Sequence, residues 1–128
     1  MKRVVIDTNV LVSALWTRQS NASRIVDMIV TRALQLCYNS EIMSEYKNVL
    51  SRPNFKFSAT DISNLLDLIK YEGISILTVP SQIHFIDESD RVFYDVAKAC
   101  SAYLITGNKK HFPQEAFILN PAEFLSIC

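Results

Sequence analysis

Short apolar runs alternate along this sequence with longer segments in which apolar residues recur every three or four positions. Most of the short runs lack strict alternation, which is typical of strands covered on both faces in a parallel sheet. The longer segments have the spacing of helices with one buried face. Strands are predicted at residues 2–6, 34–38, 74–79, 102–106 and 117–119, with a brief extended piece at 84–86.

Helices are predicted between these strands. Their apolar stripes lie within residues 10–15, 22–33, 41–50, 62–69, 93–100 and 124–127. The residues best suited to cap three of them are Ser20 or Asn21, Ser40 and Thr60, and Gly73 is the predicted end of the fourth helix. Because strands and helices alternate, we expect one domain over residues 1–128, a three-layer α/β/α sandwich with a mostly parallel sheet.

Composition narrows the function classes. The chain has 128 residues, and Lys+Arg and Asp+Glu number 13 each, so no overall basicity indicates a nucleic-acid partner. The three cysteines are odd in number and lack a C-x-x-C pair, which favours reduced thiols in a cytoplasmic protein. The N-terminus resembles neither a signal peptide nor a membrane span. With two glycines, the chain lacks a Gly-rich phosphate-binding loop.

Asp7 comes directly after the first predicted strand. In parallel α/β sheets ligands bind at the carboxyl ends of the strands, so Asp7 lies where sites are built. An unpaired carboxylate at the end of a buried strand is costly unless something uses it. The alternative is that Asp7, or Thr8 beside it, only caps the next helix. This stretch alone is compatible with both interpretations.

Glu45 falls within the apolar stripe of the helix predicted at 41–50, three residues after Ile42 and four before Val49. A carboxylate on an inward helix face needs a counter-charge, because desolvation otherwise raises its pKa or destabilises the helix. Glu41, in the first turn, fits the ordinary role of a solvated glutamate beside the positive end of the helix dipole. Glu45 is therefore the stronger candidate for a site.

Polar residues also flank the later elements. Asp90 stands just before the helix that carries Phe93, where an aspartate fills the N-cap position well. Asp95 lies on the opposite side of that helix and is expected to face solvent. Asn108 follows the strand at 102–106, again a polar group at a strand end. The pattern alone does not place Asp90 beside Asp7.

Four blocks of sequence carry these polar residues. They are VVIDTNVLVS (4–13), SEYKNVL (44–50), DESD (87–90) and ITGNKKHFP (105–113). In this order they resemble the signature blocks of the PIN-domain ribonucleases, and more narrowly the branch of toxins from toxin–antitoxin systems. The closing NPAEFL (120–125) is also similar to that branch. Each block alone is weak, but together they span nearly the whole chain.

The resemblance implies a metal-dependent endoribonuclease that hydrolyses single-stranded RNA. It implies that Asp7, Glu45 and Asp90 gather in one pocket as the catalytic acids and metal ligands. It also implies a protein antitoxin and a homodimer as partners. Many members have a fourth acid where this chain has Asn108, so we expect one firm ion and a second recruited with substrate. The residues implied as weaker or supporting ligands are Asn108, Thr8, Asn9 and Thr106.

Electrostatics supports a cation at such a cluster. Two carboxylates about 4 Å apart repel by roughly 4 kcal/mol at an effective dielectric near 20, and a third adds to this. Because the cluster offers oxygen ligands without His or Cys, Mg²⁺ or Mn²⁺ is favoured over zinc. The ion would lower the pKa of a bound water and stabilise charge on the leaving oxygen.

A neutral chain must attract RNA through local charge. The cations that adjoin the expected site are Arg91, Lys109, Lys110 and His111. Further loop candidates for backbone contacts are Arg18, Arg52 and Lys56. Each is equally consistent with an ordinary solvated side chain. Trp16 with Phe55 or Phe57 has the chemistry to stack on bases, although packing in the core or in a dimer is the simpler interpretation.

Two other functions compete with the ribonuclease. A receiver-like phosphotransfer domain would need a second acid in the 7–9 block and a lysine at a later strand end, where this chain has Asn9 and Thr106. A PIN-like module that binds RNA or protein without cutting is favoured by Asn108 and opposed by the presence of all three acids.

Overall fold

The computed structural model describes all 128 residues and contains one five-stranded sheet. The strands are β1 (Lys2–Ile6), β2 (Leu34–Tyr38), β3 (Ile74–Ser75), β4 (Tyr103–Ile105) and β5 (Ile118–Leu119). They pair in the order β3-β2-β1-β4-β5, and every pairing is parallel. The central strand is therefore β1, and the pair Ile6↔Ile105 brings its carboxyl end beside that of β4.

Helices cover both faces of this sheet, which gives a PIN-like α/β/α fold. They are α1 (Thr8–Trp16), α2 (Asn21–Val30), α3 (Ser40–Leu50), α4 (Ala59–Glu72), α5 (Arg91–Cys100) and α6 (Pro121–Ser126), with short 3-10 turns η1 (Pro53–Phe55), η2 (Glu88–Asp90) and η3 (Lys109–His111). Helix α5 packs on β1, β2 and β4 and contacts α3, while α2 packs on β2 and contacts α1 and α6. None of the helices has the length and apolarity needed to cross a bilayer.

The predicted strands and helices are present, with corrections at their ends. Two caps were predicted one or two residues late: Asn39 caps α3 by accepting from Ile42 N–H at 2.9 Å, and Ser58 caps α4 by accepting from Asp61 N–H at 3.0 Å. Ser20 caps α2 as predicted. The stripe expected to continue to Ala33 ends earlier, because α2 stops at Val30.

The prediction of a strand over 74–79 was wrong in length. Ile76 N–H still donates to the Tyr38 carbonyl at 3.0 Å, but β2 ends there and Asn39 caps α3, so the following residues have no strand to pair with. The extended piece expected at 84–86 is likewise not a strand. Phe85 is buried there by its ring contacts with Tyr94 and Phe112 instead.

Asp95 was predicted to face solvent, and this was also wrong. The carboxylate is buried and accepts a hydrogen bond from Ser81 N–H at 3.1 Å. The reason lies in the segment between β3 and η2, which crosses the outer side of α5 and covers it. Helical periodicity alone describes which side of α5 faces the sheet, and it carries no information about a loop that covers the other side.

Gly73 ends α4 for a steric reason. Its φ is −84°, so no left-handed conformation requires glycine there. A Cβ at this position would lie 2.5 Å from the Ile69 carbonyl oxygen and 2.7 Å from that of Leu36. The absence of a side chain therefore allows the end of α4 to approach β2 closely.

Substitution Gly73→Ala is expected to lower the free energy of unfolding by about 2 kcal/mol, because backbone must move to make room for the methyl group. Gly107→Ala is the matched control, since a Cβ there meets nothing within 4 Å. Urea unfolding followed by circular dichroism measures both. Equal midpoints for the two variants would contradict the steric explanation.

Candidate active site at the carboxyl edge of the sheet

Asp7 occupies the point where β1 gives way to α1. Its backbone N–H donates to the Ile105 carbonyl at 2.9 Å, which continues the β1–β4 pairing to the last residue before the helix. Asp7 is at the N-cap position, yet its carboxylate makes no capping hydrogen bond. The side chain is buried, 6% exposed. The carboxylate therefore lies near the first amides of α1, which lower its pKa, without forming the capping hydrogen bond.

A relay of hydrogen bonds from the end of β4 holds this carboxylate. The Thr106 hydroxyl donates to Asp7 Oδ2 at 2.7 Å, and the Thr106 oxygen in turn accepts from Asn108 N–H at 3.0 Å. Because the Asn108 amide occupies a lone pair of the hydroxyl oxygen, the hydroxyl proton is directed at Asp7. Burial raises the pKa of Asp7, while the Thr106 hydroxyl, the amides of Thr8 and Asn9 and the charge of His111 lower it.

Glu45 reaches the same edge from α3. Thr8, in the first turn of α1, donates its hydroxyl to Glu45 Oε2. The next residue on α3, Tyr46, is fully buried and donates its hydroxyl to the Ile6 carbonyl, so α3 is attached to the end of β1. Burial raises the pKa of Tyr46, and the negative charges of Asp7 and Glu45 raise it further.

Asp90 comes from a third segment. Asp87 accepts from Ser89 N–H at 3.0 Å and shapes η2, which delivers Asp90 to the start of α5. Asp90 Oδ2 is buried without a hydrogen-bond partner, and His111 Nδ1 lies 3.6 Å from it. Burial, followed by the negative charges of Asp7 and Asp87, raises the pKa of Asp90 to about 6.

The three acids predicted from sequence thus lie close enough to interact, since the negative charges of Asp7 and Glu45 add to the effect of burial in raising the pKa of Asp90. As their side chains stand, no group of three or more His, Cys, Asp or Glu residues has the spacing to hold an ion. Mg²⁺ is usually held by only one or two carboxylates and keeps several waters. An all-oxygen set that includes an unpartnered buried oxygen on Asp90 fits such a cation.

The four residues predicted to contact nucleic acid differ in whether they already form ion pairs in the structure. Arg91 is engaged, pairing with Glu88 at 2.7 Å, donating to the Ser81 carbonyl at 2.6 Å and lying over the Phe85 ring. Lys109 pairs with Glu123 at 2.9 Å. Lys110 is exposed and makes no ion pair, and His111 adjoins Asp90. The last two are therefore the cations most available beside the acids.

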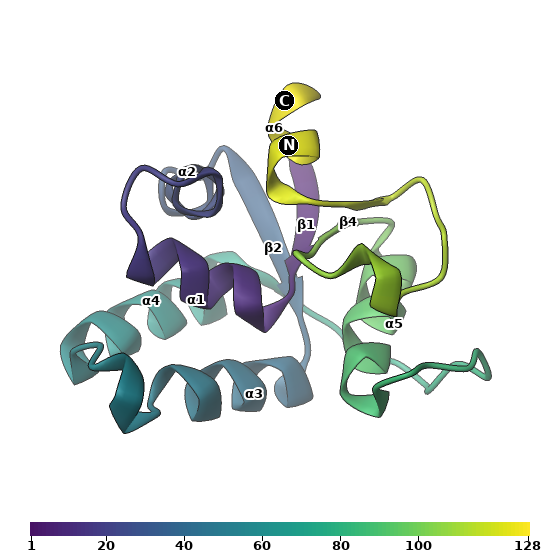
Figure 1. Cartoon of the computed structure of the whole chain (residues 1–128), viewed down its shortest axis with the longest axis horizontal. Helices are drawn as coiled ribbons and strands as arrows, with labels where there is room; N and C mark the ends of the chain where they lie inside the picture. The colour runs from purple at the N-terminus through teal and green to yellow at the C-terminus, as the bar shows by residue number, and fades with distance from the viewer.

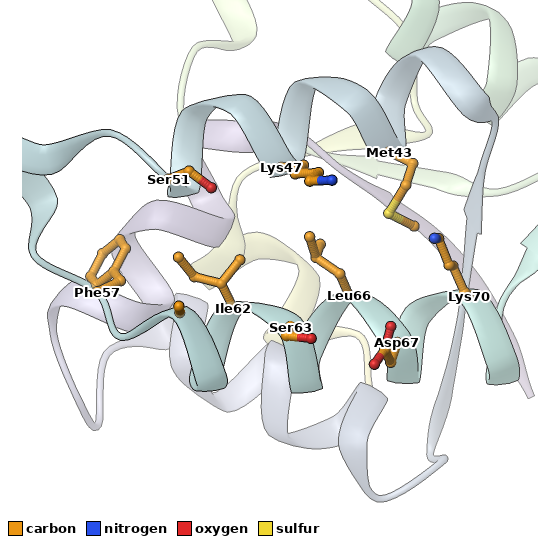
Figure 2. A pocket seen from close by; sticks show the side chains of 10 residues that line it. Met43, Lys47, Ser51, Phe57, Ile62, Ser63, Leu66, Asp67 and Lys70 are labelled. Atoms are coloured by element: carbon orange, nitrogen blue, oxygen red, sulfur yellow. The ribbon is translucent and has the colours of Figure 1, made fainter.

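A separate groove of about 390 Å³ lies between α3 and α4. Figure 2 shows Met43 and Lys47 of α3 facing Ile62 and Leu66 of α4, with Phe57 at one end. None of the predicted acids lines it, because Glu45 lies on the side of α3 that faces α1. The acidic edge of the sheet, rather than this groove, is the candidate active site.

The fold and this acidic edge together define a class, an α/β/α domain with carboxylates at the end of its central strand. A sequence model of the PIN domain matches residues 3–110. The chain belongs to the PIN-domain family, which has a nuclease-type fold; its members are generally nucleases that use divalent metals. It is also 29% identical over 110 residues to an uncharacterized protein of Methanocaldococcus jannaschii, covering 84% of this chain and 71% of that protein.

Sequence reasoning missed the contacts that position the acids. The bond from Thr8 to Glu45 joins α1 to α3, and the bond from Tyr46 to Ile6 joins α3 to β1. One signal was available: Tyr46 lies in the apolar stripe of α3, and a buried tyrosine hydroxyl needs a partner. The roles of the predicted ligands Asn9 and Asn108 stay predictions, since both side chains are exposed.

Without metal, Asp90→Asn is expected to raise the free energy of unfolding by about 2 kcal/mol at pH 7.5 and to change it little at pH 4. The pKa of Asp90 is about 6 in the folded chain against an ordinary value of 3.8. A raised carboxyl pKa means that the folded state holds the proton more tightly, so wild-type stability falls as the pH rises from about 4 through 6.

Urea unfolding in EDTA at the two pH values measures this difference. Asp27→Asn is the matched control, because Asp27 is exposed on α2 and makes no ion pair. An equal effect of Asp90→Asn at both pH values, or a loss of stability at pH 7.5, would show that ionised Asp90 does not destabilise the folded chain.

Proposed function

We propose that this chain is an endoribonuclease that hydrolyses phosphodiester bonds of single-stranded RNA and depends on Mg²⁺ or Mn²⁺. The observation that carries the proposal is the convergence of Asp7, Glu45 and Asp90 from three separate segments. Burial raises the pKa of Asp90, and the negative charges of Asp7, Asp87 and Glu45 raise it further. Membership of the PIN-domain family supports the same reaction class.

Asp7, Glu45 and Asp90 would hold the ion, and Thr8, Thr106 and the two asparagines Asn9 and Asn108 would orient these acids and the water around them. When bound, a divalent ion supplies an activated water and stabilises charge on the leaving oxygen. The donor set fits a hard cation because it consists of oxygen atoms.

The chain's own groups have distinct tasks in this proposal. Thr106 fixes Asp7 through the 2.7 Å hydrogen bond, so Asp7 cannot swing away when substrate enters. Asp90 has a buried oxygen without a hydrogen-bond partner, so it is the acid with an oxygen free to accept a proton from water. Thr8 holds Glu45 in the equivalent way from α1.

The cationic residues near the acids would bind the phosphates of the RNA. Lys110 and His111 lie on η3, next to Asp90, and are the first candidates to contact the RNA backbone. Lys109 and Arg91 already pair with Glu123 and Glu88, so they contribute through the local positive field more than through free donors.

The resemblance of the sequence blocks extends the proposal to a cytoplasmic toxin held inactive by a protein antitoxin, with the chain acting as a homodimer. Growth of bacterial cells tests the toxin role directly. Induced expression of the wild-type chain should arrest growth, whereas Asp7→Asn expressed to the same level should not. Unimpaired growth of both cultures would contradict the toxin role and leave the ribonuclease proposal in place.

Cleavage of single-stranded RNA tests the reaction itself. With Mn²⁺, the wild-type chain should cut a 20-nucleotide RNA, and Asp7→Asn and Glu45→Gln should each lower the rate at least about 100-fold, because each removes a charge from the ion site. EDTA should abolish cleavage. Gel analysis of end-labelled RNA provides the measurement.

Asp27→Asn again serves as the control, with unchanged activity expected because this residue lies on α2. Cleavage at wild-type rate by all variants would indicate a contaminating nuclease and overturn the site assignment. Binding of RNA without any cleavage would favour the second candidate, a PIN-like module that binds RNA or protein, for which Asn108 in place of a fourth acid is the specific support.

A further inference from the structure

An aromatic cluster formed by Trp16, Phe55 and Phe57 lies outside the candidate active site. Trp16 ends α1 and is 58% exposed. Its ring lies edge-on to Phe55 at 5.4 Å and to Phe57 at 6.1 Å, while Phe55 and Phe57 stack on each other at 5.5 Å. No ring stacks in parallel on the indole. The half-buried phenylalanines therefore support Trp16 through edge contacts, and neither covers a face of the indole ring.

The aromatic cluster is continuous with the acidic edge. Figure 1 shows α1 and α3 running side by side away from the end of β1, and the two helices are in contact. Thr8, which binds Glu45, begins α1, and Trp16 ends it about 12 Å away at 1.5 Å per residue. A single strand that leaves the acids along α1 therefore reaches Trp16 within a few nucleotides.

The exposed side chains of α1 between the two points are not acidic. On α1 the exposed residues are Asn9 and Ser13, at the spacing that places them on the same face as Trp16. On α3 the residue one turn beyond Glu45 is Asn48, which is exposed. A polyanion following this path meets amide and hydroxyl groups after it leaves the acids.

Three cationic residues lie within three positions, in sequence, of a ring of the aromatic cluster. Arg18 follows α1, Arg52 precedes η1, and Lys56 follows it in a left-handed conformation with φ 58°. All three are exposed, and none forms an ion pair in the structure. Exposed aromatic rings beside unpaired cations are the combination that binds single-stranded nucleic acid, in which bases stack and phosphates pair with charge.

We propose that Trp16, supported by Phe55 and Phe57, is a stacking platform for a base of single-stranded RNA whose backbone continues to the acidic edge. This inference rests on the proposed function for its substrate class. It assigns the platform to binding and positioning, with no part in bond cleavage. Packing of Trp16 against another protein chain is the alternative that the experiment must distinguish.

Trp16 is the only tryptophan, so its fluorescence reports this position alone. The full chain is titrated in EDTA, which prevents cleavage, with a ten-nucleotide oligoadenylate RNA. Saturable quenching is expected. An abasic strand of the same length and charge is expected to quench much less, because it can pair with the cations and cannot stack.

Anisotropy of labelled oligoadenylate then compares variants. Trp16→Leu should weaken binding about tenfold, since it keeps apolar packing and removes the stacking surface, while Trp16→Phe should stay within about threefold of wild type. Tyr71→Leu is the matched control, because Tyr71 is 88% exposed on α4 and should not affect binding. Unfolding midpoints verify that the variants are folded.

Wild-type affinity for Trp16→Leu, or equal quenching by the abasic strand, would overturn the platform. A change in molecular mass of Trp16→Leu by light scattering, without a change in RNA affinity, would identify a contact between protein chains and would also overturn it. These outcomes are separate from the proposed function: loss of cleavage in Asp7→Asn with normal binding by Trp16→Leu would uphold the nuclease and reject the platform.

Discussion

Burial of acidic side chains at the end of β1 is the constraint on which the site depends. Asp7 is buried, Asp90 has a buried oxygen without a partner, and the charges of Asp7 and Glu45 bear on Asp90. Burial and the neighbouring negative charges together raise the pKa of Asp90 to about 6. Keeping ionised acids in this arrangement lowers the stability of the folded chain, and a bound cation would restore it by neutralising their charge.

The rest of the chain holds each acid in place. Thr106, just after β4, holds Asp7, while Thr8 holds Glu45 from α1 and His111 approaches Asp90 from η3. Every partner comes from a different element than the acid it serves. The order β3-β2-β1-β4-β5 makes this arrangement available, because it places the end of β1 between its two parallel neighbours.

The sequence was sufficient to predict the α/β/α class and the approximate positions of the strands and helices, since buried parallel strands and one-sided helices leave clear periodic patterns. It also indicated that Glu45 lies on the inward side of α3. Asp90 could be brought to Asp7 only through family resemblance, because no local pattern states which strand ends are neighbours in space. Asp95 was misplaced for the related reason that its cover is a loop distant from α5 in sequence.

Calorimetric titration with Mn²⁺ tests the central claim most directly, because it measures the cation site without requiring substrate. The account predicts one saturable site in the wild-type chain at pH 7.5. It further predicts that Asp7→Asn abolishes this site and that Asp27→Asn preserves it. Absence of binding to the wild-type chain, or equal binding by wild type and Asp7→Asn, would contradict the claim that these acids form a metal centre.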